Sequence, residues 1–153
     1  MPFETVGMPN QRGGAFGLGT PDNVTISATT TDNKTGRFAL SIRIGGNVLA
    51  RLGWAPRRDR VLLMEGTGRE AGLVKVILAS ANQRPSYALS SNGDDEKTGN
   101  IKVSASAFRH HEVPQAAHPQ VAVEFQAFGG EMLLMFPQWV AHRKVRANQE
   151  IEA

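Results

Sequence analysis

Apolar and polar residues alternate most regularly in residues 37–44, RFALSIRI, where nearly every second side chain is hydrophobic. Successive side chains of an extended chain point to opposite faces, so this alternation predicts a half-buried β-strand. The exposed face carries Arg37, Ser41 and Arg43, and the buried face is formed by Phe38, Leu40, Ile42 and Ile44. The strand is therefore expected to present arginine to solvent.

A short amphipathic helix is predicted directly after this strand. Gly45-Gly46 interrupts the alternation, and Asn47 is placed to cap the start of a helix. Gly53 suits a left-handed C-terminal cap, and Pro56 prevents the helix from resuming. The apolar stripe of the helix is formed by Val48, Leu49 and Leu52. Because two turns of helix are not stable alone, we expect this helix to dock on a sheet.

The remaining patterns predict two strand–helix–hairpin units. In residues 36–80 the hairpin is formed by strands at 60–66 and 73–80, separated by the turn TGREAG. Residues 100–140 repeat this order loosely, with a strand at 100–108, a helix-plus-turn segment at 109–119 and a hairpin from 120–128 and 131–139. One unit alone leaves sheet edges unpaired, and pairing with a second unit can close a barrel. The predicted fold class is therefore mainly β, a small β-barrel built from two such units.

Three segments lie outside these units. Residues 1–35 are rich in glycine and threonine and are interpreted as a flexible N-terminal arm, with one strand around residues 24–29. Residues 81–99 are interpreted as a linker with a short strand at 87–89, and residues 141–153 as a charged C-terminal tail.

Composition narrows the class of protein. The chain has 153 residues, 41% of them hydrophobic and 20% charged, which is typical of one globular domain. The absence of cysteine excludes disulfides, thiolate catalysis and cysteine–zinc sites. The N-terminus does not resemble a signal peptide, and no apolar run approaches the roughly 20 residues of a membrane helix. We expect a cytoplasmic protein with no membrane partner.

Positive charge is concentrated in one fifth of the chain. The net charge of the whole protein is +3, but residues 34–60 contain seven basic residues and one acidic residue, a net charge of +6. The basic residues are Lys34, Arg37, Arg43, Arg51, Arg57, Arg58 and Arg60. Such a concentration is typical of a surface that binds a polyanion, although a solvated basic face has the same composition.

No catalytic constellation is evident, so we predict neither enzymatic activity, nor a cofactor, nor a small-molecule substrate. His110, His111 and His118 are the candidates for a metal enzyme or hydrolase, but they lack the spacing of a zinc site. A solvated polar turn, sensitive to mildly acidic pH, is the favoured interpretation of these histidines. Trp54 is expected to pack in the core, with base stacking beside the arginines as the alternative.

Residues 37–80 resemble the AbrB/MazE-like swapped-hairpin DNA-binding domains of the SpoVT-AbrB superfamily. The run LARLGWAPRRDRV stands where that family has a run similar to LREKLGLKPGDRV. The shared residues are Leu49, Leu52, Gly53, Pro56, Asp59, Arg60 and Val61. Two features depart from the family pattern: Gly45-Gly46 replaces the usual proline before the helix, and Arg57-Arg58 replaces a single glycine position with an extra residue.

The resemblance implies two interleaved copies in one small β-barrel that grips double-stranded DNA. The second copy would be either the diverged segment 100–140 or a second chain in a homodimer. We therefore expect a transcriptional regulator or antitoxin-like factor of bacterial or phage type. Its predicted DNA-binding residues are the seven basic residues of segment 34–60. The alternative is a non-catalytic protein-interaction module, such as a phage inhibitor or assembly protein, that uses the same basic patch against an acidic partner.

Overall fold

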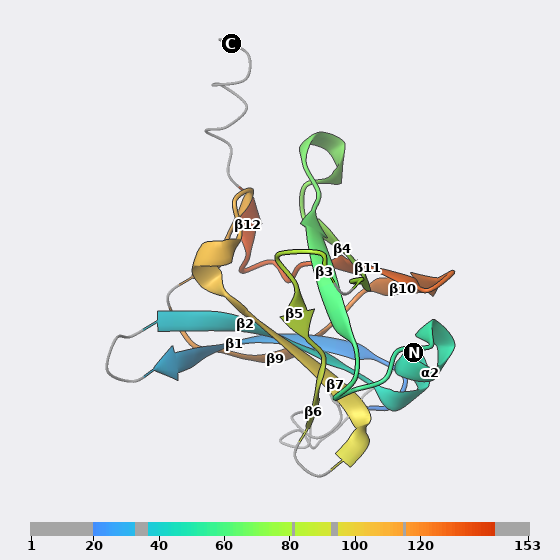
Figure 1. Cartoon of the computed structure of the whole chain (residues 1–153). Helices are drawn as coiled ribbons and strands as arrows, with labels where there is room; N and C mark the ends of the chain where they lie inside the picture. Colours follow the sequence, from blue (N-terminus) through green and yellow to red (C-terminus); the bar gives the residue numbers. More distant parts are fainter. Residues whose placement is uncertain (1–19, 33–36, 81, 93–94, 115, 143–153) are drawn as a thin grey trace, which may run out of the picture.

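Two five-stranded antiparallel sheets dominate the computed structural model, which describes residues 20–32, 37–80, 82–92, 95–114 and 116–142 (Figure 1). In sheet A the strand order is β6 (Ser90–Asn92), β7 (Asp95–Ser104), β2 (Arg37–Ile44), β1 (Val24–Asp32) and β9 (His118–Val123). In sheet B it is β10 (Phe125–Phe128), β11 (Glu131–Met135), β4 (Leu73–Leu78), β3 (Arg60–Glu65) and β5 (Tyr87–Ala88). A third sheet pairs β8 (His111–Glu112) with β12 (Ala141–His142). The mainly-β prediction is confirmed.

A single hydrophobic core joins the two sheets. Sheet A contributes inward-facing side chains such as Ile26 and Ile42, and sheet B contributes Val76 and Leu134, all fully buried in one cluster. Helix α2 (Gly46–Leu52) adds Val48, Leu49 and Leu52 to this core and packs against β7 and β10. The strand pairings of the described residues leave both sheets open, with β6 and β9 at the edges of sheet A and β5 and β10 at those of sheet B.

The predicted helix is present, and Gly53 ends it as expected. Gly53 has φ 77°, and its N–H donates to the carbonyl oxygen of Leu49 at 2.8 Å. The predicted cap at Asn47 is wrong, because the extended residue Gly45 precedes the first helical residue. At Gly45 the backbone of Pro21 lies so close that a Cβ would stand 2.5 Å from it, which only glycine permits. The Asn47 amide donates instead to Asp22 Oδ1 at 2.6 Å.

The strand predicted at 120–128 is divided between the two sheets. It breaks at Glu124, so that β9 pairs with β1 in sheet A and β10 pairs with β11 in sheet B. The alternation of inward and outward side chains continues across the break, and periodicity therefore cannot reveal that the pairing partner changes. The segment 109–119 contains the short strand β8 in place of the predicted helix, after a 3-10 helix at Ala105–Ala107.

Strands in corresponding positions of the two segments pair with each other. The first strands, β2 and β7, are antiparallel neighbours at the middle of sheet A, and the last strands of the two hairpins, β4 and β11, are neighbours in sheet B. The segment interpreted as a linker contributes β5, β6 and the beginning of β7. In the part of the chain that the structure describes, no helix is long and apolar enough to cross a membrane.

Candidate nucleic-acid interface

Four of the predicted DNA-binding residues lie on α2, in the connection to β3 or at the first residue of β3, and we call them the arginine corner: Arg51, Arg57, Arg58 and Arg60. Arg57 and Arg60 form hydrogen bonds to residues 86–91, the segment that leads into sheet A. Arg57 Nε donates to Ser91 Oγ at 2.6 Å, and Arg60 donates to both the hydroxyl and the carbonyl oxygen of Ser86 at 2.8 Å. The backbone N–H of Arg57 also donates to the Leu89 carbonyl at 2.7 Å. These two arginines therefore have a structural role, and both side chains remain exposed.

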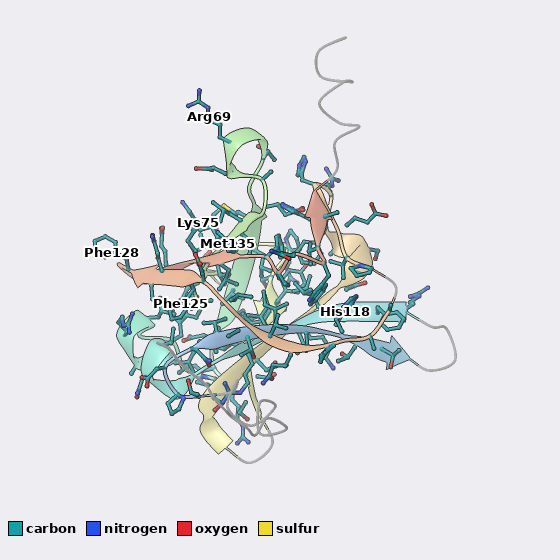
Figure 2. The ribbon with its side chains drawn as sticks, turned by 180° about the vertical axis from the view of Figure 1, so that it is seen from behind. Arg69, Lys75, His118, Phe125, Phe128 and Met135 are labelled. Carbon is teal, nitrogen blue, oxygen red and sulfur yellow. The ribbon has the colours of Figure 1, made fainter. Side chains whose placement is uncertain are left out.

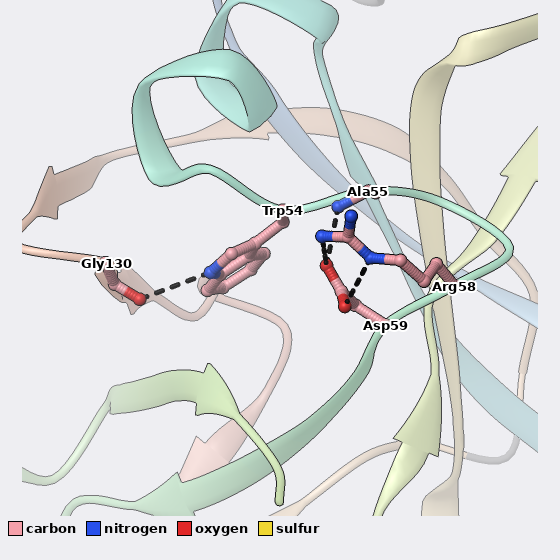
Figure 3. A network of polar contacts seen from close by, with 5 residues as sticks. All are labelled: Trp54, Ala55, Arg58, Asp59 and Gly130. Carbon is pink, nitrogen blue, oxygen red and sulfur yellow. Dashed lines mark hydrogen bonds and ion pairs between the residues drawn. The ribbon is translucent and has the colours of Figure 1, made fainter.

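Arg58 forms an ion pair within the corner itself. Its guanidinium donates to both carboxylate oxygens of Asp59, at 3.0 and 2.9 Å, and the Ala55 N–H donates to the same carboxylate at 2.7 Å (Figure 3). The hydrogen bond from Arg58, assisted by that from Ala55, holds the pKa of Asp59 below its usual value despite the opposing effect of burial. Part of the positive charge of the corner is thus neutralised locally. Arg51 is exposed on the surface of α2.

Arg57 adopts an unusual backbone conformation, with φ 72°. This is the left-handed region, which glycine adopts freely and which costs other residues about 1–2 kcal/mol. The chain therefore has an arginine at a position where glycine would remove strain, and strain of this kind is concentrated at functional sites.

Trp54 belongs to the core. It is 4% exposed, and its indole N–H donates to the carbonyl oxygen of Gly130 at 3.2 Å, as Figure 3 shows. The expectation of core packing is confirmed. In this position the ring face is not accessible to a nucleic-acid base.

Arg43 lies away from the corner, in a shallow groove on the outer face of sheet A with a volume of about 270 Å³, which we call the polar groove. Its eight lining residues are all polar, two are basic and none is acidic: Thr25, Ser27, Thr29, Ser41, Arg43, Asn100, Lys102 and Gln120. The residues in the middle are small, and the hollow follows from their size.

The register of the strands explains how two cations come together in this groove. Arg43 on β2 lies opposite Asn100 on β7, and Ser41 lies opposite Lys102, so Arg43 and Lys102 are diagonal neighbours about 7 Å apart. In the described structure, Lys102 has no hydrogen bond or ion pair, and Arg43 makes a single long hydrogen bond of 3.4 Å to the Thr20 carbonyl. Neighbouring like charges without a counter-charge attract an anion.

The groove also contains a buried polar atom without a partner. Thr25 is 1% exposed, and its hydroxyl makes no hydrogen bond to any described residue. Leaving a buried hydroxyl unpaired costs about 1–3 kcal/mol, so such groups are rare in folded proteins.

The structure thus divides the predicted site residues into two separate sets. Ser91, which holds Arg57, lies opposite Gly99 on the core-facing side of the edge strand β6, whereas Arg43 lies opposite Asn100 on the outer face of sheet A. Arg37 is exposed at the start of β2, and Lys34 lies outside the described residues. Sequence reasoning missed Lys102 and Thr25, although the alternation in NIKVS and VTIS places both on the outward faces of their strands.

The histidines are not a solvated cluster. His111 is fully buried, and the Gly72 N–H donates to its Nε2 at 2.8 Å, so the proton is on Nδ1, which donates to Glu65 at 2.8 Å. The predicted solvated turn is therefore wrong for His111. His118 instead stacks on Trp139, with ring centroids 4.3 Å apart. Among the described residues, no group of three histidines and carboxylates is arranged to hold a metal ion.

Glu65 is the central acceptor of this buried contact. It also accepts hydrogen bonds from the backbone N–H groups of Arg109, at 2.7 Å, and His110, at 2.9 Å. Burial opposes its ionisation, but these hydrogen bonds and that from His111 outweigh burial and leave the pKa of Glu65 below its usual value. The arrangement joins the β3–β4 hairpin to residues 109–111.

The chain matches none of the protein-family models, curated proteins or solved structures with which it was compared. Its function must therefore be inferred from its own residues.

Proposed function

We propose that this protein binds double-stranded DNA through the polar groove on the outer face of sheet A, with the arginine corner, which contacts the edge strand β6, as a separate basic surface. The observation that carries the proposal is the pair of cations, Arg43 and Lys102, in a groove whose lining is entirely polar and contains no acidic residue. Arginine, lysine, serine, threonine, asparagine and glutamine are the side chains that contact phosphate oxygens in protein–DNA complexes. A hollowed sheet face with these side chains offers a phosphate backbone several hydrogen-bond donors at once.

Two further observations support a regulator related to the AbrB-like domains. The strand, short helix and hairpin of residues 37–78 follow in the order that the resemblance implies, and Arg57, which stands at the position of the family's glycine, has a positive φ that favours glycine. Pairing of β2 with β7 and of β4 with β11 is what two interleaved copies within one chain would produce. We therefore propose a DNA-binding transcriptional regulator or antitoxin-like factor, with the two segments as a pseudo-dimer in a more open version of the family's barrel.

The first test is binding to duplex DNA of mixed sequence, measured by fluorescence anisotropy at several salt concentrations. Each cation that contacts a phosphate contributes about 0.9 to the slope of log affinity against log salt. The double variant Arg43→Ala/Lys102→Ala should therefore reduce this slope by about 2 and weaken binding by roughly 10- to 100-fold at 0.1 M salt.

The matched control is Arg69→Ala/Lys75→Ala, which removes the same charge from two exposed residues of the β3–β4 hairpin (Figure 2). This control should bind DNA with nearly the affinity and salt slope of the unmodified protein. Equal losses in the two double variants would mean that net charge, and not the polar groove, governs binding, and would contradict the proposal.

The outer face of sheet B favours a second candidate function, a protein-interaction module. Phe128 projects from the tip of the β10–β11 hairpin with 87% of its surface exposed (Figure 2). Met64 and Met135 on the same sheet are nearly half exposed. Exposed apolar groups on one face are typical of protein contact surfaces. Under this alternative neither double variant changes DNA binding, because the unmodified protein does not bind DNA.

A further inference from the structure

Thr25 Oγ1 is the one buried side-chain oxygen or nitrogen of the described residues that has no hydrogen-bond partner. The position of Thr25 in sheet A explains why its hydroxyl has no partner. On β1, Thr25 lies between Arg43 of β2 and Ala122 of β9, and its side chain forms part of the floor of the polar groove. A ligand in the groove would be the natural partner for this hydroxyl.

Several groups that line the polar groove together with Thr25 can donate hydrogen bonds. Ser41 Oγ donates to Asn100 Oδ1 at 3.0 Å, which leaves the Asn100 NH2 group available to donate. Arg43 and Lys102 can only donate, and the Thr25 hydroxyl is free to do so. A ligand that satisfies all of these groups must supply several acceptors and negative charge, which is the chemistry of a phosphate oxyanion.

We propose that the polar groove holds one phosphate group, bound by Arg43, Lys102, Asn100 and the Thr25 hydroxyl. This inference rests on the proposed function in naming a backbone phosphate of DNA as the first source, and a free phosphorylated ligand is the second source of the same chemistry. The unpaired hydroxyl is part of a binding site that the ligand completes.

A ligand can reach the Thr25 hydroxyl only if a neighbouring group moves, and we expect this group to be Arg43. Thr25 is 1% exposed, so neighbouring side chains close over its hydroxyl in the free protein. Arg43 lies directly opposite Thr25, and its only hydrogen bond in the described structure is the long one of 3.4 Å to the Thr20 carbonyl. A phosphate oxygen offers the guanidinium a shorter, charge-assisted bond, and exchange of partners opens the way to Thr25. The volume of about 270 Å³ suits a phosphate with its adjoining sugar and not a whole cofactor.

The test uses Thr25→Val, which removes the hydroxyl and nearly conserves the volume of the side chain. Inorganic phosphate is titrated into the full-length protein at constant ionic strength with chloride, and the backbone amide signals of residues 25, 43, 100 and 102 are followed by NMR. The unmodified protein should show saturable shifts at these positions. Thr25→Val should bind phosphate at least about 5-fold more weakly, the loss expected for one hydrogen bond.

Two further variants separate binding from folding. Thr25→Ser retains the hydroxyl and should retain phosphate binding, whereas Thr67→Val, an exposed threonine of the β3–β4 loop, should change nothing. Because the hydroxyl has no partner in the free protein, Thr25→Val should be at least as stable to urea as the unmodified protein. A loss of stability with unchanged phosphate binding would overturn the proposal, because the hydroxyl would then serve the fold.

Titration of the same variants with duplex DNA distinguishes this inference from the proposed function. Phosphate binding that depends on Thr25, without DNA binding, would support the phosphate site with a free ligand and reject the DNA proposal. DNA binding that is equal in Thr25→Val and the unmodified protein, with no saturable phosphate shifts, would reject the phosphate site alone. Parallel losses of phosphate and DNA binding would support both.

Discussion

The arginines of this protein have different roles that depend on their individual neighbours. Arg58 is paired with Asp59, Arg60 and Arg57 hold the serines of segment 86–91, and Arg43 lies in a groove beside a second cation. In the sequence these residues form a single basic segment. In the structure, their side-chain contacts give them separate roles. Among them, only Arg43 has a single long hydrogen bond as its one described side-chain interaction.

The strain at Arg57 leads to a prediction at the residue scale. Arg57→Gly and Arg57→Ala both remove the hydrogen bond to Ser91 Oγ, but only alanine retains the penalty of a positive φ. The glycine variant should therefore be more stable than the alanine variant by about 1 kcal/mol in urea unfolding. Equal stabilities would show that this turn relaxes to another conformation and that Arg57 is not strained.

At the scale of elements, the β3–β4 hairpin is attached to the rest of the molecule by a buried polar contact. Glu65 is at the end of β3 and Gly72 precedes β4, and both bind His111, one at each ring nitrogen. His111 also packs against the ring of Phe136, with centroids 4.5 Å apart. Removing the side chain of Glu65 or His111 would leave buried hydrogen-bond donors or acceptors unpaired, which lowers the stability of the fold.

This contact makes stability depend on pH. The folded state lowers the pKa of Glu65, so the ionised carboxylate stabilises the fold above its unfolded pKa, and this contribution is lost as pH falls through the folded pKa. Glu65→Gln should lower the free energy of unfolding by about 2 kcal/mol at pH 7 and reduce the difference in stability between pH 7 and pH 3.

The corresponding measurement is urea unfolding at a series of pH values. The control is Glu131→Gln. Glu131 is an exposed residue of β11, and its Oε1 is 3.9 Å from Lys75 Nζ. This variant should retain the pH dependence of the unmodified protein. A Glu65→Gln variant with the same acid profile as the control would show that the Glu65 carboxylate does not contribute to acid sensitivity.

At the scale of the whole molecule, the two segments of the chain depend on each other. The central pairs of the two sheets, β2 with β7 and β4 with β11, each join a strand from the first segment to one from the second. Separating the segments would expose these strand edges and half of the common core.

The fragments 1–80 and 81–153 should accordingly be unfolded when each is expressed alone, and an equimolar mixture should regain the circular dichroism and NMR spectra of the intact protein. Independent folding of fragment 1–80 as a monomer would contradict this prediction. It would mean that the first segment closes its own sheet edges.

Much of the local structure follows from the sequence. The alternation in residues 37–44 places Ile42 inward and Arg43 outward, and the structure confirms it. Helix α2, its Gly53 cap and the β3–β4 hairpin follow from short-range patterns of the same kind. These features depend on side-chain periodicity and backbone conformations of a few residues, which neighbours in the sequence determine.

The candidate site was decided by the tertiary structure. Arg43 and Lys102 are 59 residues apart, and they meet only because β2 and β7 are neighbours in sheet A. The division of strand 120–128 at Glu124 and the burial of His111 against Glu65 likewise depend on partners distant in the chain. The sequence by itself thus determined which residues face outward and where positive charge is concentrated. Only the pairing of distant strands decided which of those residues share a surface, because periodicity carries no information on a strand's partner.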